Sequence, residues 1–331
     1  MKPPIFIVGP HRSGSTLWHN LIALCPGVMR LPEPFFLGPP RQRDFSFFLR
    51  TQARDLFDSA EISKMVELCF SKKNIPGLEG ALWRFEGIRA AENPELHREI
   101  ARRIEHDPDR SLGTVARVII EEITRFSRYE RACVKFPVDI DHVAELLQWF
   151  PDGKIVHIIR DPRAVAMSKS NDPSGTALKV LEHPRLAWLI RKAAVYLVVK
   201  EYRASAKLHA RLQDVRNYEL FRYEDLLADP KNTLKRLCAF IDCEFTESML
   251  HPEKGEHDHQ PSSLTGKRRK AFDRSAAIRW QQVISRADDL VISWLTKGTM
   301  KKLGYNPETH PIFKDARRAG EQTPQPVLTD S

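Results

Sequence analysis

The chain has 331 residues, of which 42% are hydrophobic and 29% are charged, and its formal net charge is +9. This composition is that of a soluble globular protein, and the length suits one α/β domain with insertions or a small domain pair. No run of about 18 apolar residues is present, so no membrane-spanning helix is expected, and the positive charge suits anionic partners such as nucleotides, nucleic acids or anionic lipids.

Short apolar segments alternate with helical patterns along the chain. The segments Ile5–Val8, Ala132–Phe136 and Lys154–Ile159 predict buried parallel strands, and Tyr218–Tyr223 predicts a fourth. Helices are predicted between the strands, at Ser15–Leu24 and Asp141–Phe150, and after the last strand, at Thr233–Ile241. Strands that alternate with helices predict a P-loop NTPase-like, three-layer α/β/α fold with a central parallel sheet.

The pattern changes in two other parts of the chain. Between about residues 41 and 130 it indicates charged helices, among them Ser111–Tyr129, which we interpret as an inserted helical cap. Residues 307–331 are rich in Pro, Thr and charge, which predicts a flexible C-terminal tail. We therefore expect a single domain over residues 1–306.

The sharpest local signal is the octapeptide G-P-H-R-S-G-S-T at Gly9–Thr16, between the first predicted strand and the first predicted helix. It matches the nucleotide P-loop pattern G-x-x-x-x-G-K-[ST] at every defined position except the lysine, where Ser15 stands. Glycines permit the tight turn, and N–H groups at a helix start bind anions. Without the lysine that reaches the outer phosphates of a triphosphate, the remaining groups suit a smaller 5′-phosphosulfate. These groups are Arg12, Ser13, Gly14, Ser15 and Thr16.

A second motif, I-V-H-I-I-R-D-P-R, spans Ile155–Arg163, and Ser168 follows Arg160 by eight residues. Asp161 is expected to cap the next helix, which would hold Arg160 at the carboxyl end of a strand, where open α/β sheets bind ligands. With the octapeptide, this motif resembles the nucleotide-dependent sulfotransferases, most closely their tyrosylprotein and carbohydrate branch. The resemblance implies 3′-phosphoadenosine-5′-phosphosulfate (PAPS) as donor, with its 3′-phosphate at Arg160 and Ser168.

The resemblance also implies roles for four further positions. The motif F-R-Y-E-D-L at Phe221–Leu226 places Tyr223 near the adenine, and Lys135 and Arg12 become cations near the transferred group. Tyrosylprotein sulfotransferases carry a glutamate in almost the position of Glu33, which makes Glu33 the predicted general base. The cytosolic branch has its base histidine where Pro137 stands here.

Other histidines and basic residues are given lesser roles. His11 lies within the octapeptide and His19 follows it, and both are expected at the solvent surface, although they and His142 are the next candidates for the base. His251, His257 and His259 are interpreted as loop residues, so no metal is expected. The basic run Lys267–Lys270 is interpreted as a lid over the nucleotide rather than a nucleic-acid patch.

The sequence thus predicts sulfuryl transfer to a hydroxyl on a small molecule, glycan, lipid or peptide, without a nucleic-acid partner. Two alternatives stay open. One is a P-loop kinase, which the missing lysine disfavours, and the other is a non-catalytic nucleotide- or nucleic-acid-binding module, for which no helix-turn-helix, RNP-type or zinc pattern is found.

The five cysteines are scattered and form no C-x-x-C pair, which predicts reduced thiols. The run Ile5–Val8 is too short for a signal-peptide core. A cytoplasmic protein is the expectation.

Overall fold

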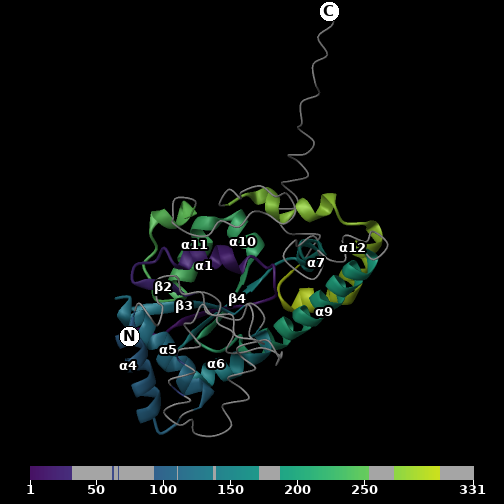
Figure 1. Cartoon of the computed structure of the whole chain (residues 1–331). Helices are drawn as coiled ribbons and strands as arrows, with labels where there is room; N and C mark the ends of the chain where they lie inside the picture. Colours follow the sequence, from purple (N-terminus) through teal and green to yellow (C-terminus); the bar gives the residue numbers. More distant parts are fainter. Residues whose placement is uncertain are drawn as a thin grey trace, which may run out of the picture.

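The computed structural model describes residues 1–31, 62, 66, 93–109, 111–136, 139–170, 187–252 and 272–305. In these ranges, five parallel strands form one sheet in the order β2-β3-β1-β4-β5, near the middle of the molecule (Figure 1). The strands are β1 (Ile5–Val8), β2 (Val28–Leu31), β3 (Arg131–Phe136), β4 (Lys154–Ile159) and β5 (Tyr218–Arg222). The predicted parallel sheet is confirmed.

Helices cover both faces of this sheet (Figure 1). Alternate residues of β1 face opposite sides, as the two-residue period of a strand requires. Phe6 and Val8 lie in the core on one side, and Ile5 and Ile7 lie in the core on the other. The first core includes α4 (Pro94–His106), α5 (Leu112–Phe126) and α6 (Val143–Trp149), and the second includes α1 (Ser15–Ile22), α10 (Tyr223–Ala228) and α11 (Pro230–Phe240). The three-layer architecture is therefore confirmed.

A third core lies beside β4 and β5. It joins α7 (Pro162–Ser170), α9 (Ala187–Leu212) and α12 (Arg286–Lys302). Short 3₁₀ helices complete the described elements, at Asp139–His142, Glu247–Leu250, Arg274–Ala277 and Arg279–Gln282. None of the helices in the described ranges is long and apolar enough to cross a membrane.

The structure differs from the sequence prediction at one strand. β2 was not predicted, because it is a four-residue edge strand whose middle residues, Met29 and Arg30, are half-buried and break the apolar run. The strands and helices for which ranges were predicted lie where they were expected, with ends displaced by up to about three residues, whereas no range was predicted for α9.

The predicted cap is described only in part. α4 and α5 lie in this stretch, and α5 packs on β3 and buries Val115, Val118, Ile119 and Ile123 in the core under the sheet. This helix therefore belongs to a layer of the fold. The rest of the predicted cap and residues 307–331 lie mostly or wholly outside the described ranges, and the domain boundaries stay a prediction.

Candidate active site

The turn between β1 and α1 has a shape that requires glycine at two positions. Gly9 has φ of +146° and Gly14 has φ of +96°, both in a region that residues with a side chain rarely adopt. A Cβ on Gly9 would lie 2.0 Å from the carbonyl oxygen of Ile158, and a Cβ on Gly14 would lie 2.5 Å from the Tyr223 ring. The turn therefore contacts β4 at its start and the first residue of α10 at its end.

Polar donors gather where this turn enters α1. Ser13 is fully buried, and its hydroxyl has no hydrogen-bond partner among the described residues. The N–H groups of Ser15 and Thr16 lie in the first turn of α1, where a helix offers them no acceptor of its own. Hydroxyl and N–H donors at a helix N-terminus suit an anion.

Arg12 connects this turn to the second motif of the sequence. Its Nε donates a 3.1 Å hydrogen bond to Oγ of Ser168, which lies 156 residues further along the chain in α7. Arg12 itself has a left-handed φ of +70° and is half-buried, whereas Ser168 is buried. The two motifs predicted to bind phosphate therefore meet at the edge formed by the carboxyl ends of β1 and β4.

Arg160, directly after β4, is buried at the same edge. Its Nη2 donates a 2.7 Å hydrogen bond to the carbonyl oxygen of Ala276, and its Cζ lies 4.6 Å from the centroid of the Tyr223 ring. The buried Nε has no hydrogen-bond partner in the part of the chain that the structure describes. Because Tyr223 also lies against Gly14, one aromatic ring links the β1–α1 turn to Arg160.

A buried carboxylate fixes the backbone beside Arg160. Glu224 accepts a 2.8 Å hydrogen bond from the N–H of Asp161 and a 2.7 Å hydrogen bond from the hydroxyl of Tyr305. Desolvation raises the pKa of the fully buried Glu224 above its ordinary value, and the nearby Asp161 raises it further, whereas both hydrogen bonds and Arg160 lower it. Sequence reasoning missed this residue, and the only signal was its place directly after Tyr223.

Asp161 holds the start of α7, as the sequence predicted for a capping residue. One of its oxygens accepts from the N–H of Arg163 at 2.8 Å, and both accept from the Arg163 guanidinium at 3.0 and 2.8 Å. The same guanidinium lies 4.4 Å above the ring of Trp280. The Arg163 guanidinium is therefore occupied by contacts within the protein, whereas Arg160 has an Nε without a partner among the described residues.

Lys135 lies in β3, which neighbours β1, and its ammonium group reaches the β1–α1 turn. Nζ donates a 3.0 Å hydrogen bond to Oγ1 of Thr16, and the side chain is buried. A cation in this position adds to the positive field of Arg12, which lies in the same turn.

Two of the candidate histidines, His19 and His142, are held by contacts within the protein. His19 is buried, and its Nε2 lies 2.9 Å from the carbonyl oxygen of Cys133, so the expectation of an exposed His19 was wrong. The ring fixes α1 to β3. His142 lies 2.8 Å from the Glu145 carboxylate. Glu33, His257, His259 and the run Lys267–Lys270 lie outside the described residues.

The described ranges contain no group of three or more His, Cys, Asp or Glu side chains that could hold a metal ion. Apart from Glu33, the residues predicted for donor binding and catalysis lie at the carboxyl ends of β1, β3, β4 and β5 or in helices that begin there. Such an edge is the usual ligand site of an open α/β sheet. The fold and this edge define an α/β protein of the P-loop NTPase-like type.

The chain belongs to the Sulfotransferase family, whose profile matches residues 3–247. It is 27% identical over 306 residues to omega-hydroxy-beta-dihydromenaquinone-9 sulfotransferase Stf3 of Mycobacterium tuberculosis, covering 86% of this chain and 74% of that protein. It is 27% identical over 209 residues to carbohydrate sulfotransferase 5 of Mus musculus, covering 58% of this chain and 49% of that protein.

Solved structures with the same fold include the sulfotransferase domain from the curacin biosynthetic pathway. Its TM-score is 0.57 at 18% identity, and the alignment covers 92% of this chain and 99% of that domain. The protein is therefore a sulfotransferase, and the alternatives of a P-loop kinase and of a non-catalytic binding module are set aside.

Proposed function

We propose that this sulfotransferase transfers a sulfuryl group from PAPS to a hydroxyl acceptor, with Glu33 as general base. The observation that carries the proposal is that the two motifs predicted to bind phosphate meet through the hydrogen bond from Arg12 to Ser168. A donor with phosphate groups at both its 5′ and 3′ positions needs two such motifs at one place. A cytoplasmic location is part of the proposal, and the free thiols at the four described cysteines are consistent with it.

The residues present fit such a donor. The β1–α1 turn offers the hydroxyl of Ser13 and the first N–H groups of α1 to the 5′-phosphosulfate. Arg160 offers its buried Nε to the 3′-phosphate, and guanidinium groups match phosphate oxygens well. The ring of Tyr223, between these two groups, supplies an aromatic surface for the adenine.

In the proposed reaction, the acceptor oxygen forms a bond to sulfur while the bond between sulfur and the bridging phosphate oxygen breaks. The acceptor proton goes to the Glu33 carboxylate, and the negative charge that leaves with adenosine-3′,5′-bisphosphate is stabilised by Lys135 and Arg12. Transfer of this kind depends on positioning and charge neutralisation more than on covalent chemistry with the protein, so no metal is required.

The acceptor is proposed only as a class. The named relatives include sulfotransferases of a hydroxylated menaquinone, of carbohydrates and of protein tyrosine, whose acceptors all carry hydroxyl groups. A hydroxyl acceptor on a small molecule, glycan, lipid or peptide is consistent with all of them.

The proposal is tested with ³⁵S-labelled PAPS and a panel of acceptors. The panel contains 4-nitrophenol, N-acetylglucosamine, farnesol and a tyrosine-containing peptide. Label is expected in at least one acceptor, and adenosine-3′,5′-bisphosphate is expected to raise the melting temperature more than ATP does at equal concentration. Stabilisation by ATP alone, together with no labelled product, would refute the proposal.

A further inference from the structure

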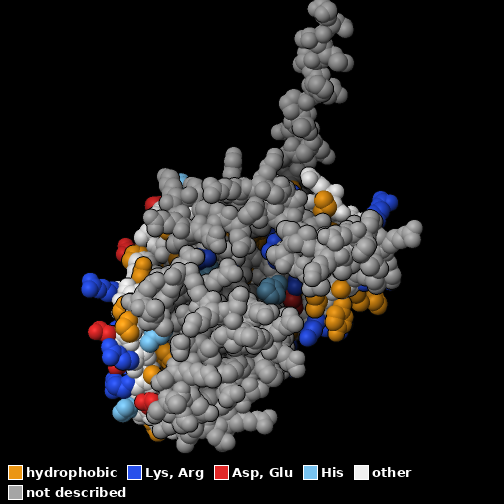
Figure 2. Space-filling view, viewed as in Figure 1, with side chains coloured by type: hydrophobic (Ala, Val, Ile, Leu, Met, Phe, Trp, Pro, Cys, Tyr) orange, Lys and Arg blue, Asp and Glu red, His pale blue; other side chains and the backbone are white. Residues whose placement is uncertain are grey.

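An exposed apolar patch covers one side of α9 and α12. Its exposed fractions are large for such side chains: 78% for Trp294, 71% for Leu290, 69% for Tyr196, 48% for Val291 and 45% for Leu197. Figure 2 shows hydrophobic side chains gathered at the lower right, in the region where Figure 1 places α9 and α12. A contiguous patch of this kind on a soluble protein marks an interaction surface.

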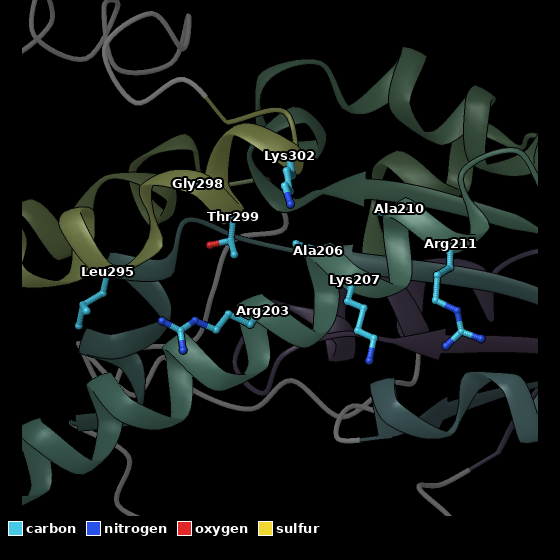
Figure 3. Close-up of a pocket in the computed structure, with 9 residues that line it drawn as sticks. All are labelled: Arg203, Ala206, Lys207, Ala210, Arg211, Leu295, Gly298, Thr299 and Lys302. Carbon is cyan, nitrogen blue, oxygen red and sulfur yellow. The ribbon is translucent and has the colours of Figure 1, made fainter.

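A basic groove continues the same side of the two helices. It has a volume of about 600 Å³ and is lined by Arg203, Lys207 and Arg211 from α9 and by Thr299 and Lys302 from α12, among others. In Figure 3 these α9 side chains follow one another along the helix opposite Leu295, Thr299 and Lys302 of α12. All four basic residues are exposed.

Helical periodicity places the patch and the groove on one face. Tyr196 precedes Arg203 by two turns of α9, and Val291 precedes Leu295 by one turn of α12, so both lie on the side that lines the groove. In Figure 3, Leu295, Thr299 and Lys302 follow one another along α12 in the same direction as Arg203, Lys207 and Arg211 follow one another along α9. The face is therefore apolar at its N-terminal half and basic at its C-terminal half.

We propose that this face docks the enzyme on a membrane surface that contains anionic phospholipid. Trp294 and its apolar neighbours would enter the interfacial region, where tryptophan and tyrosine side chains are favoured. The basic groove would lie against the lipid phosphates, since each Lys or Arg near an anionic membrane surface contributes favourably. This inference does not depend on the identity of the acceptor.

Charge favours a lipid surface over a second copy of the chain. Two copies that met through this face would bring their basic grooves toward each other, and like charges in an interface are unfavourable. Of the nearby carboxylates, Asp289 pairs with Arg163, and Asp288, which accepts from the hydroxyl of Ser285, lies in the first turn of α12 rather than along the basic groove. A phosphate-bearing surface supplies the negative charge that the face lacks.

The face also lies close to the candidate site. α9 and α12 both pack against α7, the helix that carries Ser168. Docking through α9 and α12 would therefore hold the donor-binding edge at a fixed distance from the membrane.

The test is co-sedimentation of the full chain with vesicles of phosphatidylcholine alone or with 30% phosphatidylglycerol. Binding is expected only with the anionic lipid and is expected to fall with added salt. Arg203→Gln with Lys207→Gln should weaken binding about 25-fold, at about 1 kcal/mol for each charge. Trp294→Ser should weaken it about tenfold, by the loss of buried apolar area.

Matched controls come from α4, from the end of α5 and from the turn after it, outside the proposed face. Arg98→Gln with Arg128→Gln removes two exposed charges from the region of α4 and α5, and Phe126→Ser removes a side chain that is 48% exposed. These variants should bind as the unaltered protein does. Quenching of tryptophan fluorescence by brominated lipid should be lost in Trp294→Phe if Trp294 enters the interface.

Three outcomes would overturn the proposal. One is equal binding to both kinds of vesicle, and another is equal weakening by the control variants. The third is a dimer in sedimentation velocity that Trp294→Ser dissociates while lipid binding is absent, which would assign the face to a second copy.

Discussion

At the scale of single residues, the environment of Arg160 matches a role in binding the donor. The side chain is held from two sides, by the carbonyl oxygen of Ala276 and by the ring of Tyr223, yet its Nε has no partner among the described residues. A buried guanidinium with one donor to spare is costly unless a ligand satisfies it.

Arg160→Ala is therefore expected to weaken binding of adenosine-3′,5′-bisphosphate by about 30- to 1000-fold, or about 2–4 kcal/mol. Affinity for adenosine-5′-phosphosulfate, which lacks the 3′-phosphate, should stay near that of the unaltered protein. Isothermal titration calorimetry checks both, with Arg216→Ala at an exposed position as the control. Equal losses for the two nucleotides would show that Arg160 does not recognise the 3′-phosphate.

Glu33→Gln should lower turnover about 100- to 10,000-fold, the usual effect of losing a general base. The amide keeps the size of the side chain but does not accept the acceptor's proton, so affinity for adenosine-3′,5′-bisphosphate should change little. Single-turnover assays with labelled PAPS measure the first effect, and Glu95→Gln on the exposed side of α4 serves as the control. Full turnover in Glu33→Gln would move the search for the base to His11, His19 or His142.

At the scale of elements, the β1–α1 turn depends on its contact with α10. Gly14 combines a left-handed backbone with a site where a Cβ would meet the Tyr223 ring. One substitution there therefore strains the turn and displaces a residue of the proposed donor site.

Gly14→Ala should destabilise the protein by about 1–3 kcal/mol through backbone strain and should also weaken binding of adenosine-3′,5′-bisphosphate. The part of this destabilisation that comes from the clash with the Tyr223 ring should be smaller when Tyr223→Ala is already present. A double-mutant cycle in urea unfolding measures the difference. Gly298→Ala is the control, since a Cβ there meets nothing within 4 Å and should stabilise α12. Strict additivity of the two site substitutions would contradict the contact.

At the scale of the whole molecule, a buried polar cluster joins the sheet to α9. His157 of β4 contacts the hydroxyl of Tyr218 at 2.7 Å and the hydroxyl of Ser205 at 3.2 Å, and His209 contacts the same Tyr218 hydroxyl at 3.2 Å. Burial lowers the pKa of His157 to about 3, with a smaller contribution from His209, whose own pKa is also lowered by burial. The cluster is therefore neutral in the folded protein.

This cluster predicts a loss of stability in mild acid. Below about pH 6.5 the unfolded chain takes up a proton on His157 that the folded protein does not, so the free energy of unfolding falls until the pH nears 3. Between pH 7 and pH 5 the loss from this one fully buried group is about 2 kcal/mol. Urea unfolding at both values should show a smaller difference in His157→Gln, and an unchanged difference would rule out His157 as the cause.

Much of the fold and of the candidate site follows from local pattern. The runs that became β1, β3 and β4 are short and mostly apolar. Backbone angles confine Gly9 and Gly14, in the turn between β1 and α1, to glycine. β2 was not predicted, because an edge strand needs no continuous apolar run. The role of Glu224 was not predicted, because its hydrogen-bond partners, Asp161 and Tyr305, lie far from it in the sequence.

The sequence by itself determined the parallel sheet, the octapeptide and the family, since strand period, turn chemistry and motif spacing are local properties. Only the tertiary structure decided which groups meet. The contact of Arg12 with Ser168, the ring of Tyr223 between Gly14 and Arg160, and the burial of His19 depend on strand order. The carboxyl ends of β1, β3, β4 and β5 lie at one edge because parallel strands joined by crossovers all end on the same side of their sheet, and the strand order decides which of these ends are neighbours.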